Sequence, residues 1–418
     1  MELAALSVRG SSDPLPPKAA RETRRPSGRL RSGGQFHGGR FGFRVVSRDG
    51  LARLGRLTTP HGEVETPAFM PVGTLGAVKG LSQDVLEAAG ARLLMTNLFH
   101  LLERVGPDRI TGLGGLHEFI GWDGPLAMDS GGYQVFSLAG LRRVDDRGVT
   151  FRSPHDGSTV ELTPERVVEF QEQIGVDAAM VLDECPPWPV DREAAAEALR
   201  RTNLWARRSL DRWGADGDPA AAGLFGIVQG SFFEDLRLAA AEDLAGLPFD
   251  GYAIGGVSVG EERELGRQAV SWVAPALPDD RPRYLMGLGT PEDLFHAVSL
   301  GVDLFDCVLP SRNARHGTLF SSTGIVRIKK ARYREDPRPV DPACGCPVCR
   351  RHSRAFLHHL FRCGEITGKV LATEHNVRFY LDFMADLRRA IADGALATFA
   401  ASRLPEVGPE GEPEAERR

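Results

Sequence analysis

Short apolar runs recur along residues 41–330, and glycine, proline or a polar residue closely follows most of them. Each run is short enough for a parallel strand that is buried on both faces. The eight runs are PAFMPV (67–72), RLLMTN (92–97), PLAMDS (125–130), DAAMVLDE (177–184), GLFGIVQG (223–230), GYAIGG (251–256), RYLMGLG (283–289) and VDLFDC (302–307).

Segments with helical periodicity lie between several of these runs. In LTPERVVEFQEQIG, Thr163 is a candidate N-cap, Pro164 suits the first helical position, and apolar residues follow at helical spacing. Thr290 and Pro291 repeat this start before LFHAVSLG. Eight strands alternating with helices predict a closed α/β fold, a (β/α)8 TIM barrel.

Other parts of the chain depart from this alternation. Residues 141–162 alternate polar and apolar positions around HDG, which predicts an inserted β-hairpin, and a similar antiparallel cover is expected at 41–66. Residues 1–40 are rich in Arg, Ser, Pro and Gly, and 401–418 are acidic, so both are expected to be disordered. The barrel would then span 41–330, and a smaller subdomain with the last barrel helix would span 331–400.

Polar residues stand where the predicted strands end, which is the catalytic face of such a barrel. The polar ones are Asp129, Asp183, Gln229 and Asp306, and Gly255, Gly256, Met286 and Gly287 stand at the same strand ends. Any one of these acids alone is more often a helix cap or a loop residue. Three carboxylates and a carboxamide around one mouth are more than packing requires, so we expect an active site there.

Two of the acids suggest a division of labour. Asp306 ends an apolar strand, and partial desolvation suits a carboxylate that forms a covalent ester. Asp129 is followed by two glycines, which would let the backbone approach a flat ligand, and by Tyr133, which could stack on it. One aspartate as nucleophile and one as proton donor and acceptor is the arrangement of a retaining glycosyl transfer.

A third motif predicts a metal site. Cys344, Cys346 and Cys349 lie within CGCPVC, and His375 follows 26 residues after the last of them. Three thiolates and one imidazole saturate a tetrahedral zinc ion, which indicates a structural rather than catalytic metal. Cys363 is a rival fourth ligand inside a predicted helix, while Cys185 and Cys307 are expected to be small buried residues.

Composition and charge bear on the cellular compartment and on the kind of binding partner. The net charge is −5, yet residues 327–354 carry nine Lys/Arg and only three acids, which suggests a specific polyanion partner, although a solvated face is the plainer alternative. Six cysteines with one metal motif fit a reducing compartment, so a cytoplasmic protein is expected. Neither an apolar signal core nor an apolar run of membrane-spanning length is present, so export and membrane insertion are not expected.

At this point the chain resembles a known family. The segments MDSGGYQVFSL, LDECPP, GIVQG, GYAIGG, YLMGLGTPEDL, LFDCVLPSRNAR and CGCPVC with EHNVRFY are similar, in order and spacing, to the bacterial queuine tRNA-ribosyltransferases (tRNA-guanine transglycosylases) over about residues 41–400. The resemblance implies a TIM barrel with a zinc subdomain. It also implies exchange of guanine at the wobble position of tRNAs with GUN anticodons, through a covalent tRNA–aspartyl intermediate, for the queuosine precursor 7-aminomethyl-7-deazaguanine (preQ1).

The resemblance also implies residue roles. Asp306 would be the nucleophile, Asp129 the general acid/base, and Cys344, Cys346, Cys349 and His375 the zinc ligands. The base would be bound by Ser130, Gly131, Gly132, Tyr133, Asp183, Gln229, Gly255, Gly256, Val257 and Met286. The tRNA would be contacted by Gly287, Leu288, Gly289, Thr290, Pro291, Glu292, Asp293, Ser311, Arg312, Asn313, Ala314 and Arg315.

Some positions differ from the usual bacterial pattern. Val257 and Ser258 stand where Leu and Ala are common, and Ser311 replaces a common Thr, whereas Cys185 and Val259 match the bacterial enzymes that use preQ1 rather than queuine. The resemblance further implies a homodimer. The alternatives are a queuine-using variant, a non-catalytic tRNA-binding subunit of the same fold, and a glycosidase acting on small sugars.

Overall fold

The computed structural model describes residues 40–136, 142–215 and 222–403. Its centre is a closed barrel of eight parallel strands in the order β10-β11-β12-β13-β14-β4-β5-β6, and the β14–β4 pairing closes the ring. All eight predicted runs form these strands, so the (β/α)8 prediction is confirmed. The strands are β4 (Ala68–Gly73), β5 (Leu94–Asn97), β6 (Leu126–Asp129), β10 (Ala178–Met180), β11 (Gly223–Val228), β12 (Gly251–Ile254), β13 (Arg283–Leu285) and β14 (Leu304–Cys307).

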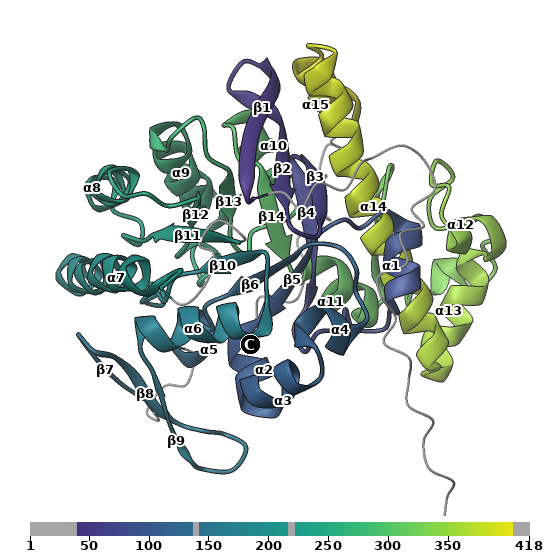
Figure 1. The fold of residues 1–418 in the computed structure, drawn as a ribbon. Coiled ribbons are helices and arrows are strands. Elements are labelled where there is room, and N and C mark those ends of the chain that lie inside the picture. Colours follow the sequence, from purple (N-terminus) through teal and green to yellow (C-terminus); the bar gives the residue numbers. More distant parts are fainter. Residues whose placement is uncertain (1–39, 137–141, 216–221, 404–418) are drawn as a thin grey trace, which may run out of the picture. The chain divides into compact units, whose positions relative to one another are not determined.

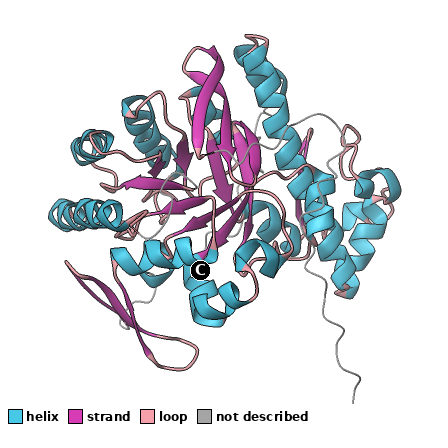
Figure 2. Cartoon of the chain, in the orientation of Figure 1, coloured by secondary structure: helices cyan, strands magenta, loops and turns pink. Residues whose placement is uncertain are grey.

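Helices surround these strands, as Figures 1 and 2 show. Those between and after the barrel strands are α1 (Gln83–Ala89), α2 (Leu98–Arg104), α3 (Pro107–Gly112), α4 (Gly115–Ile120), α5 (Gly132–Phe136), α6 (Pro164–Ile174), α7 (Arg192–Arg212), α8 (Glu234–Ala245), α9 (Arg263–Val273) with the short η1 (Ala274–Ala276), α10 (Pro291–Ser299), α11 (Leu309–His316) and α14 (Ile366–Ala392). Thr163 and Thr290 cap α6 and α10 as expected, because each hydroxyl accepts the N–H three residues on.

Two antiparallel sheets accompany the barrel. The expected cover at its start is the sheet of β1 (Gly42–Asp49), β2 (Ala52–Thr59) and β3 (Gly62–Thr66). The insertion at 141–162 differs from the expected hairpin, because β7 (Arg142–Asp145) adds a third strand to β8 (Gly148–Arg152) and β9 (Thr159–Leu162). The HDG segment forms the β8–β9 turn, as predicted.

The region after the barrel has a small core of its own. It contains the hairpin β15 (Thr318–Ser321) and β16 (Gly324–Arg327), then η2 (Ala331–Tyr333), α12 (Pro347–Arg351) and α13 (Arg354–Cys363), which pack beside α14 (Figure 1). Its buried residues are Ala314, Leu319, Val326, Ile328, Tyr333, Val340, Cys346, Val348, Leu357, Leu360 and Ala372. Helix α14 also contacts β4 and α11, so it joins this core to the barrel.

The two ends predicted to be disordered lie almost entirely outside the described residues. Helix α15 (Leu396–Arg403) includes the first three residues of the predicted tail, so 401–403 are helical. None of the described helices combines the length and the apolar character needed to cross a lipid bilayer.

Candidate active site and metal centre

Asp306 lies near the carboxyl end of β14, where the strand opens onto the mouth of the barrel. The Tyr284 hydroxyl donates to its Oδ1 at 2.6 Å, and the Gly287 N–H donates to the same oxygen at 2.9 Å. Both hydrogen bonds end on Oδ1, so Oδ2 receives none from the described residues. Burial raises the pKa of Asp306, although these two donors oppose the shift. The carboxylate is therefore held in place with one oxygen available for reaction.

Asp129 ends β6 on the same side of the barrel. Asn97 Nδ2 donates to Oδ2 at 2.6 Å, and the N–H groups of Leu98 and Gly131 donate to Oδ1. Burial raises the pKa of Asp129 to about 7 against these hydrogen bonds, and the charge of Asp306 adds to the increase. The two carboxylates therefore sense each other's charge, and Asp129 can donate or accept a proton near neutral pH.

A polar cluster is built from residues at the ends of the next strands. The Asp183 carboxylate accepts hydrogen bonds from Ser130 Oγ at 3.0 Å and from Gln229 Nε2 at 2.7 Å. All three side chains are buried. Because a carboxylate only accepts, Nε2 of Gln229 must face Asp183 and its Oε1 must face the other way. That Oε1 is buried and has no hydrogen-bond partner. Such an atom costs about 1–3 kcal/mol unless a ligand donor meets it.

The glycines at this polar cluster allow close packing. A Cβ on Gly131 would come within 3.0 Å of Phe99, and one on Gly132 within 2.8 Å of the Asp183 carboxylate. These contacts explain why glycine is needed at both positions, and close approach of a ligand to their backbone stays a prediction. A Cβ on Gly256 would come within 2.3 Å of Gln229 Oε1, where a side chain would block the acceptor.

The remaining predicted base-binding residues differ in exposure. Tyr133 in α5 is 55% exposed and can offer its ring to a ligand, and Met286 after β13 is half-buried. Val257 is buried beside Gly255 and Gly256. Residues from the ends of β6, β10, β11, β12 and β13 are thus brought together with those of β14.

The predicted tRNA segments divide into surface and core. Gly287 and Arg312 are exposed, and Thr290, Glu292, Ser311, Asn313 and Arg315 are half-buried. The side chains of Leu288, Pro291, Asp293 and Ala314 are buried, and Gly289 packs against Cys307. Asp293 binds Arg263 and Arg267 within the fold, so its carboxylate is not presented to a partner. Only part of the predicted set can therefore contact RNA directly.

A basic groove lies beside α11, the helix that carries Arg312 and Arg315. It has a volume of about 470 Å³, and four basic side chains line it together with Phe361, Gly364 and Glu365. These four are Arg315, His316, Lys329 and Lys369. Arg315, which lines the groove, follows Asp306 within ten residues along the chain. The positive charge of the groove suits a phosphate backbone.

Two cysteines near the site are not reactive thiols. Cys185 and Cys307 are buried, as expected, and neither forms a disulfide. Burial raises the pKa of Cys185 to about 12 and that of Cys307 well above its usual value. Both stay protonated at neutral pH, so neither is a nucleophile.

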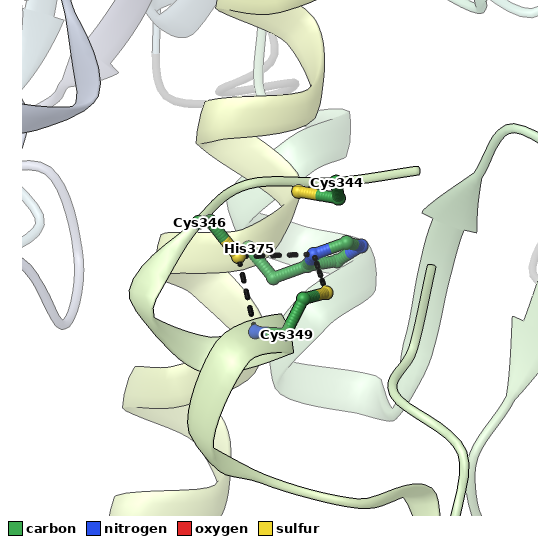
Figure 3. A group of neighbouring side chains, drawn as sticks. All are labelled: Cys344, Cys346, Cys349 and His375. Carbon is green, nitrogen blue, oxygen red and sulfur yellow. Dashed lines mark hydrogen bonds between the residues drawn. The ribbon is translucent and has the colours of Figure 1, made fainter. Parts of the chain in front are cut away.

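The predicted metal ligands form one cluster (Figure 3). The ligand atoms of Cys344, Cys346, Cys349 and His375 lie within 4.8 Å of one another. His375 Nδ1 is 3.6 Å from Cys346 Sγ and 3.3 Å from Cys349 Sγ. Bond lengths around tetrahedral zinc separate neighbouring ligand atoms by about 3.5–3.8 Å, so the spacing fits this ion.

The surroundings of the cluster also suit a metal. His375 Nε2 lies 2.7 Å from the Phe320 carbonyl oxygen, which fixes the tautomer and leaves Nδ1 facing the sulfurs. Hydrogen bonds from Cys344 and Cys349 lower the pKa of Cys346 and favour its thiolate. Cys363, the rival ligand, is exposed at the end of α13 and lies outside the cluster.

A second group, His61, His117 and Asp177, lies before β10 at the amino end of the barrel. The two imidazole rings stack with centroids 3.6 Å apart and planes inclined by 17°. An ion bound by a histidine lies near the plane of its ring, and two nearly parallel planes do not meet at bonding distance. Asp177 instead accepts His61 Nδ1 at 2.8 Å and the Leu126 N–H at 2.8 Å. Through its contacts with His61 and His117, Asp177 therefore joins the turn before β3 and helix α4 to the residue that precedes β10.

Two residues that hold the carboxylates were not among the predicted site residues. Asn97 ends β5, so the strand-end rule that selected Asp129 could have selected it too. Tyr284 lies inside the apolar run of β13 and is fully buried. Its position resembles that of any core residue, so no signal in the sequence distinguishes it.

Comparison with known proteins gives consistent similarities. A family profile described as Queuine tRNA-ribosyltransferase matches residues 48–408. Proteins named "Queuine tRNA-ribosyltransferase" are 50% identical over 357 residues in Marinobacter nauticus and 51% identical over 353 residues in Desulforudis audaxviator. These matches cover 85% and 84% of this chain and 95% and 94% of the relatives. The similar protein of Nitrosomonas europaea is 51% identical over 358 residues.

Proposed function

The chain belongs to the queuine tRNA-ribosyltransferase family, a family of glycosyltransferases, and from that premise we propose that it exchanges guanine at the wobble position of GUN-anticodon tRNAs for preQ1. The observation that carries the proposal is the pair Asp129 and Asp306 at one end of the barrel. Asp306 has a free oxygen, and Asp129 has a pKa of about 7. This pair supplies a nucleophile and a proton carrier for one carbon centre.

In the first displacement, Oδ2 of Asp306 attacks C1′ of the ribose and the bond from C1′ to the guanine nitrogen breaks. The electron pair of that bond goes to the guanine, and protonated Asp129 supplies the proton that the leaving base needs. Tyr284 and the Gly287 N–H hold Oδ1, which keeps Oδ2 directed for attack. The product is free guanine and a ribosyl ester of Asp306.

In the second displacement, the incoming base attacks C1′ while Asp129, now a carboxylate, takes its proton. The ester bond breaks and the Asp306 carboxylate is regenerated. Two inversions at C1′ restore the original configuration, and no ATP is consumed. A pKa of about 7 suits Asp129 to both steps, because acid and base forms are both populated at neutral pH.

The polar cluster beside the two acids has the hydrogen-bonding groups for a guanine-like base, and we propose it as the base pocket. Gln229 Oε1 and the Asp183 carboxylate are acceptors for the ring and amino N–H groups of such a base. The backbone N–H groups at Gly256 and Val257 could meet its carbonyl oxygen. Cys185 and Val259 match the bacterial enzymes that use preQ1, and on that ground we propose preQ1 rather than the bulkier queuine as the incoming base.

The surface beside α11 supports tRNA as the partner. Arg312 is exposed next to the basic groove of Arg315, His316, Lys329 and Lys369. Phosphate contacts there would hold the anticodon loop while the target base is flipped into the pocket. Intact Asp129 and Asp306 favour an enzyme over a non-catalytic subunit, and the basic groove favours RNA over a small glycoside.

We assign structural zinc to the cluster of Cys344, Cys346, Cys349 and His375. Four protein ligands leave no open position, so the ion would stabilise the packing of α12 against α14. Free cysteines in this cluster are consistent with the cytoplasm, which we also propose. The homodimer implied by the family resemblance is proposed on that ground alone.

The test is incorporation of radiolabelled guanine into tRNA transcripts. We expect label in a transcript with guanine at the wobble position and none in a matched transcript with adenine there. Unlabelled preQ1 should then chase the label out, and queuine should do so far less well. Equal labelling of both transcripts, or no labelling of either, would refute the proposed reaction.

A further inference from the structure

We propose that Arg237 is a positioning residue that sets the direction of the backbone N–H groups at Gly256 and Val257 for recognition of the base. The inference rests on the proposed function, because it concerns the same base pocket. Arg237 lies in α8, behind the pocket, and acts on the base through the loops after β11 and β12.

The guanidinium group of Arg237 joins these two loops. Its Nη1 donates to the Gly255 carbonyl at 2.7 Å and its Nη2 to the Gly256 carbonyl at 2.9 Å. On the other loop, Nε donates to the Ser231 carbonyl at 2.5 Å, and Nη1 lies 3.4 Å from the Val228 carbonyl. The side chain is fully buried. One planar fork therefore fixes the separation of the loops that carry Gln229 and Gly256.

The direction of the two carbonyls determines that of the adjacent N–H groups. In a trans peptide, the N–H points opposite to the C=O of the same unit. With the carbonyls of Gly255 and Gly256 held toward Arg237, the N–H groups of Gly256 and Val257 point away from it. The Gly256 N–H faces the Cys185 thiol, at the pocket side. No described residue accepts the Val257 N–H.

Glu261 holds the next part of the loop, and it binds neither the Gly256 N–H nor the Val257 N–H. The Glu261 carboxylate accepts the N–H of Ser258 at 2.6 Å and that of Val259 at 2.7 Å. Arg237 thus fixes the carbonyls before Val257, and Glu261 fixes the N–H groups after it. Between them, the Gly256 N–H has only the weak acceptor of the Cys185 thiol and the Val257 N–H has no described acceptor, so both are left for the acceptor oxygen of a bound base.

The loops held by Arg237 adopt backbone conformations that need support. Gly256 has φ of 62°, and Ser231, which is not glycine, has φ of 50°. Both residues give their carbonyl oxygens to Arg237. Loss of the guanidinium would let these peptides rotate, and a rotated Gly255–Gly256 peptide would present a carbonyl oxygen to the base where a donor is required.

The charge of Arg237 adds to the effect of its geometry. No carboxylate of the described residues lies within ion-pair distance, so four carbonyl oxygens carry the solvation of this cation. Burial lowers the pKa of Arg237 to about 10, which still leaves it charged at neutral pH. A cation on the carbonyl side of a peptide polarises it and strengthens the N–H donor on the other side.

Arg53 provides a matched control because it is equally buried but lies at the amino end of the barrel. It pairs with Asp303 and donates to the carbonyls of Asp279 and Arg281, far from the base pocket. We would compare full-length Arg237→Lys with Arg53→Lys, since both keep a charge and lose the fork. Arg237→Met, which removes the charge as well, is the stronger second variant.

The measurements are the dissociation constant of radiolabelled guanine by equilibrium dialysis, the KM values for guanine and for tRNA, and the melting temperature. For Arg237→Lys we expect the guanine dissociation constant and KM to rise about tenfold, as one hydrogen bond to the base is lost, with the KM for tRNA changed less than twofold. Arg237→Met should weaken guanine further. Arg53→Lys should melt at a lower temperature and bind guanine as the wild type does.

Two results would overturn the role of Arg237 alone. One is guanine binding within twofold of wild type in both Arg237 variants, and the other is equal weakening by Arg53→Lys, which would indicate general destabilisation. A wild-type chain that neither binds nor incorporates guanine would instead overturn the proposed function, and this inference would fall with it.

Discussion

The two ends of the barrel treat buried carboxylates in different ways. At the amino end, Asp303 pairs with Arg53, and Asp177 contacts two histidines. At the carboxyl end, Asp129 and Asp306 receive hydrogen bonds from Asn97, Tyr284 and backbone N–H groups, all of them neutral. Negative charge is therefore compensated by cationic or ionisable groups at one end and only solvated at the other.

The pKa values express this difference. Burial alone would raise the pKa of Asp177, but its contacts with His117 and His61 lower it to about 2. Burial raises that of Asp129 to about 7, and Asp306 adds to the effect. Burial also raises the pKa of Asp303, yet Arg53 matches its charge. Similar residues in one barrel thus contribute to stability at one end and, in the mechanism we propose, to reactivity at the other.

The largest effect should come from exchanging for amides the two acids near the ends of β14, which are Asp306 within the strand and Asp303 immediately before it. Asp306→Asn should lower guanine exchange by about 10⁴-fold or more with little change in melting temperature, because it removes the nucleophile. Asp303→Asn, three residues earlier, should lower the melting temperature while the folded enzyme keeps its turnover. If Asp306→Asn exchanged guanine at the wild-type rate, Asp306 would have no catalytic role that distinguishes the carboxyl end of the barrel from the amino end.

The two histidine-containing clusters allow a similar test with metal. Cys346→Ser should lose bound zinc and melt at least about 5 °C lower, since zinc binding stabilises the fold. His61→Ala should keep one zinc per chain, because the His61 group holds none, and Cys363→Ser should match the wild type. Elemental analysis and thermal melts check this, and two zinc ions per wild-type chain would contradict it.

The third test uses the opposite pKa shifts of Asp129 and Asp177. The raised pKa of Asp129 means that its ionisation costs stability as pH rises from about 4 to 7, so Asp129→Asn should be stabilising by a few kcal/mol above pH 7 and neutral near pH 4. The lowered pKa of Asp177 contributes stability above about pH 4 that is lost as pH falls toward 2. Asp177→Asn should therefore be destabilising by about 2 kcal/mol at neutral pH.

Urea unfolding of both variants and the wild type from pH 4 to 8 measures these effects. The difference between Asp129→Asn and wild type should grow over that range, whereas the loss in Asp177→Asn should stay nearly constant. If both variants changed the free energy of unfolding in the same direction at pH 8, the opposite effects expected for Asp129 and Asp177 would be refuted.

The smallest effect concerns surface charge. Arg312→Ala should raise the KM for tRNA about tenfold or less and reduce the salt dependence of tRNA binding by about one unit of the log–log slope, as expected for one lost phosphate contact. Arg56→Ala, in the sheet at the amino end, is the control and should leave both unchanged. An unaltered slope in Arg312→Ala would exclude this phosphate contact.

The barrel could be predicted because parallel strands covered on both faces appear as continuous apolar runs. The third inserted strand was missed because Arg142–Asp145 holds a single apolar residue, Val144, among charged ones. Its pairing with β8 depends on tertiary context that the local pattern does not contain.

The acids of the site could be predicted from their positions at strand ends, but their support could not. Tyr284 and Arg237 are buried in elements that look like ordinary core, and only the fold brings them to the loops they hold. The burial of Asp293 by Arg263 and Arg267 is likewise a long-range arrangement. Local sequence indicates the candidate reactive groups, and tertiary packing decides how they are held.

The most direct test of the central claim is to find the bond between Asp306 and tRNA. Full-length enzyme would be mixed with GUN-anticodon tRNA, quenched by denaturation, digested and analysed by mass spectrometry. We predict a ribosyl-linked peptide with the modification at Asp306, absent from Asp306→Asn and displaced by added preQ1. A covalent RNA adduct at another residue, or exchange that proceeds with no adduct at all, would contradict the mechanism.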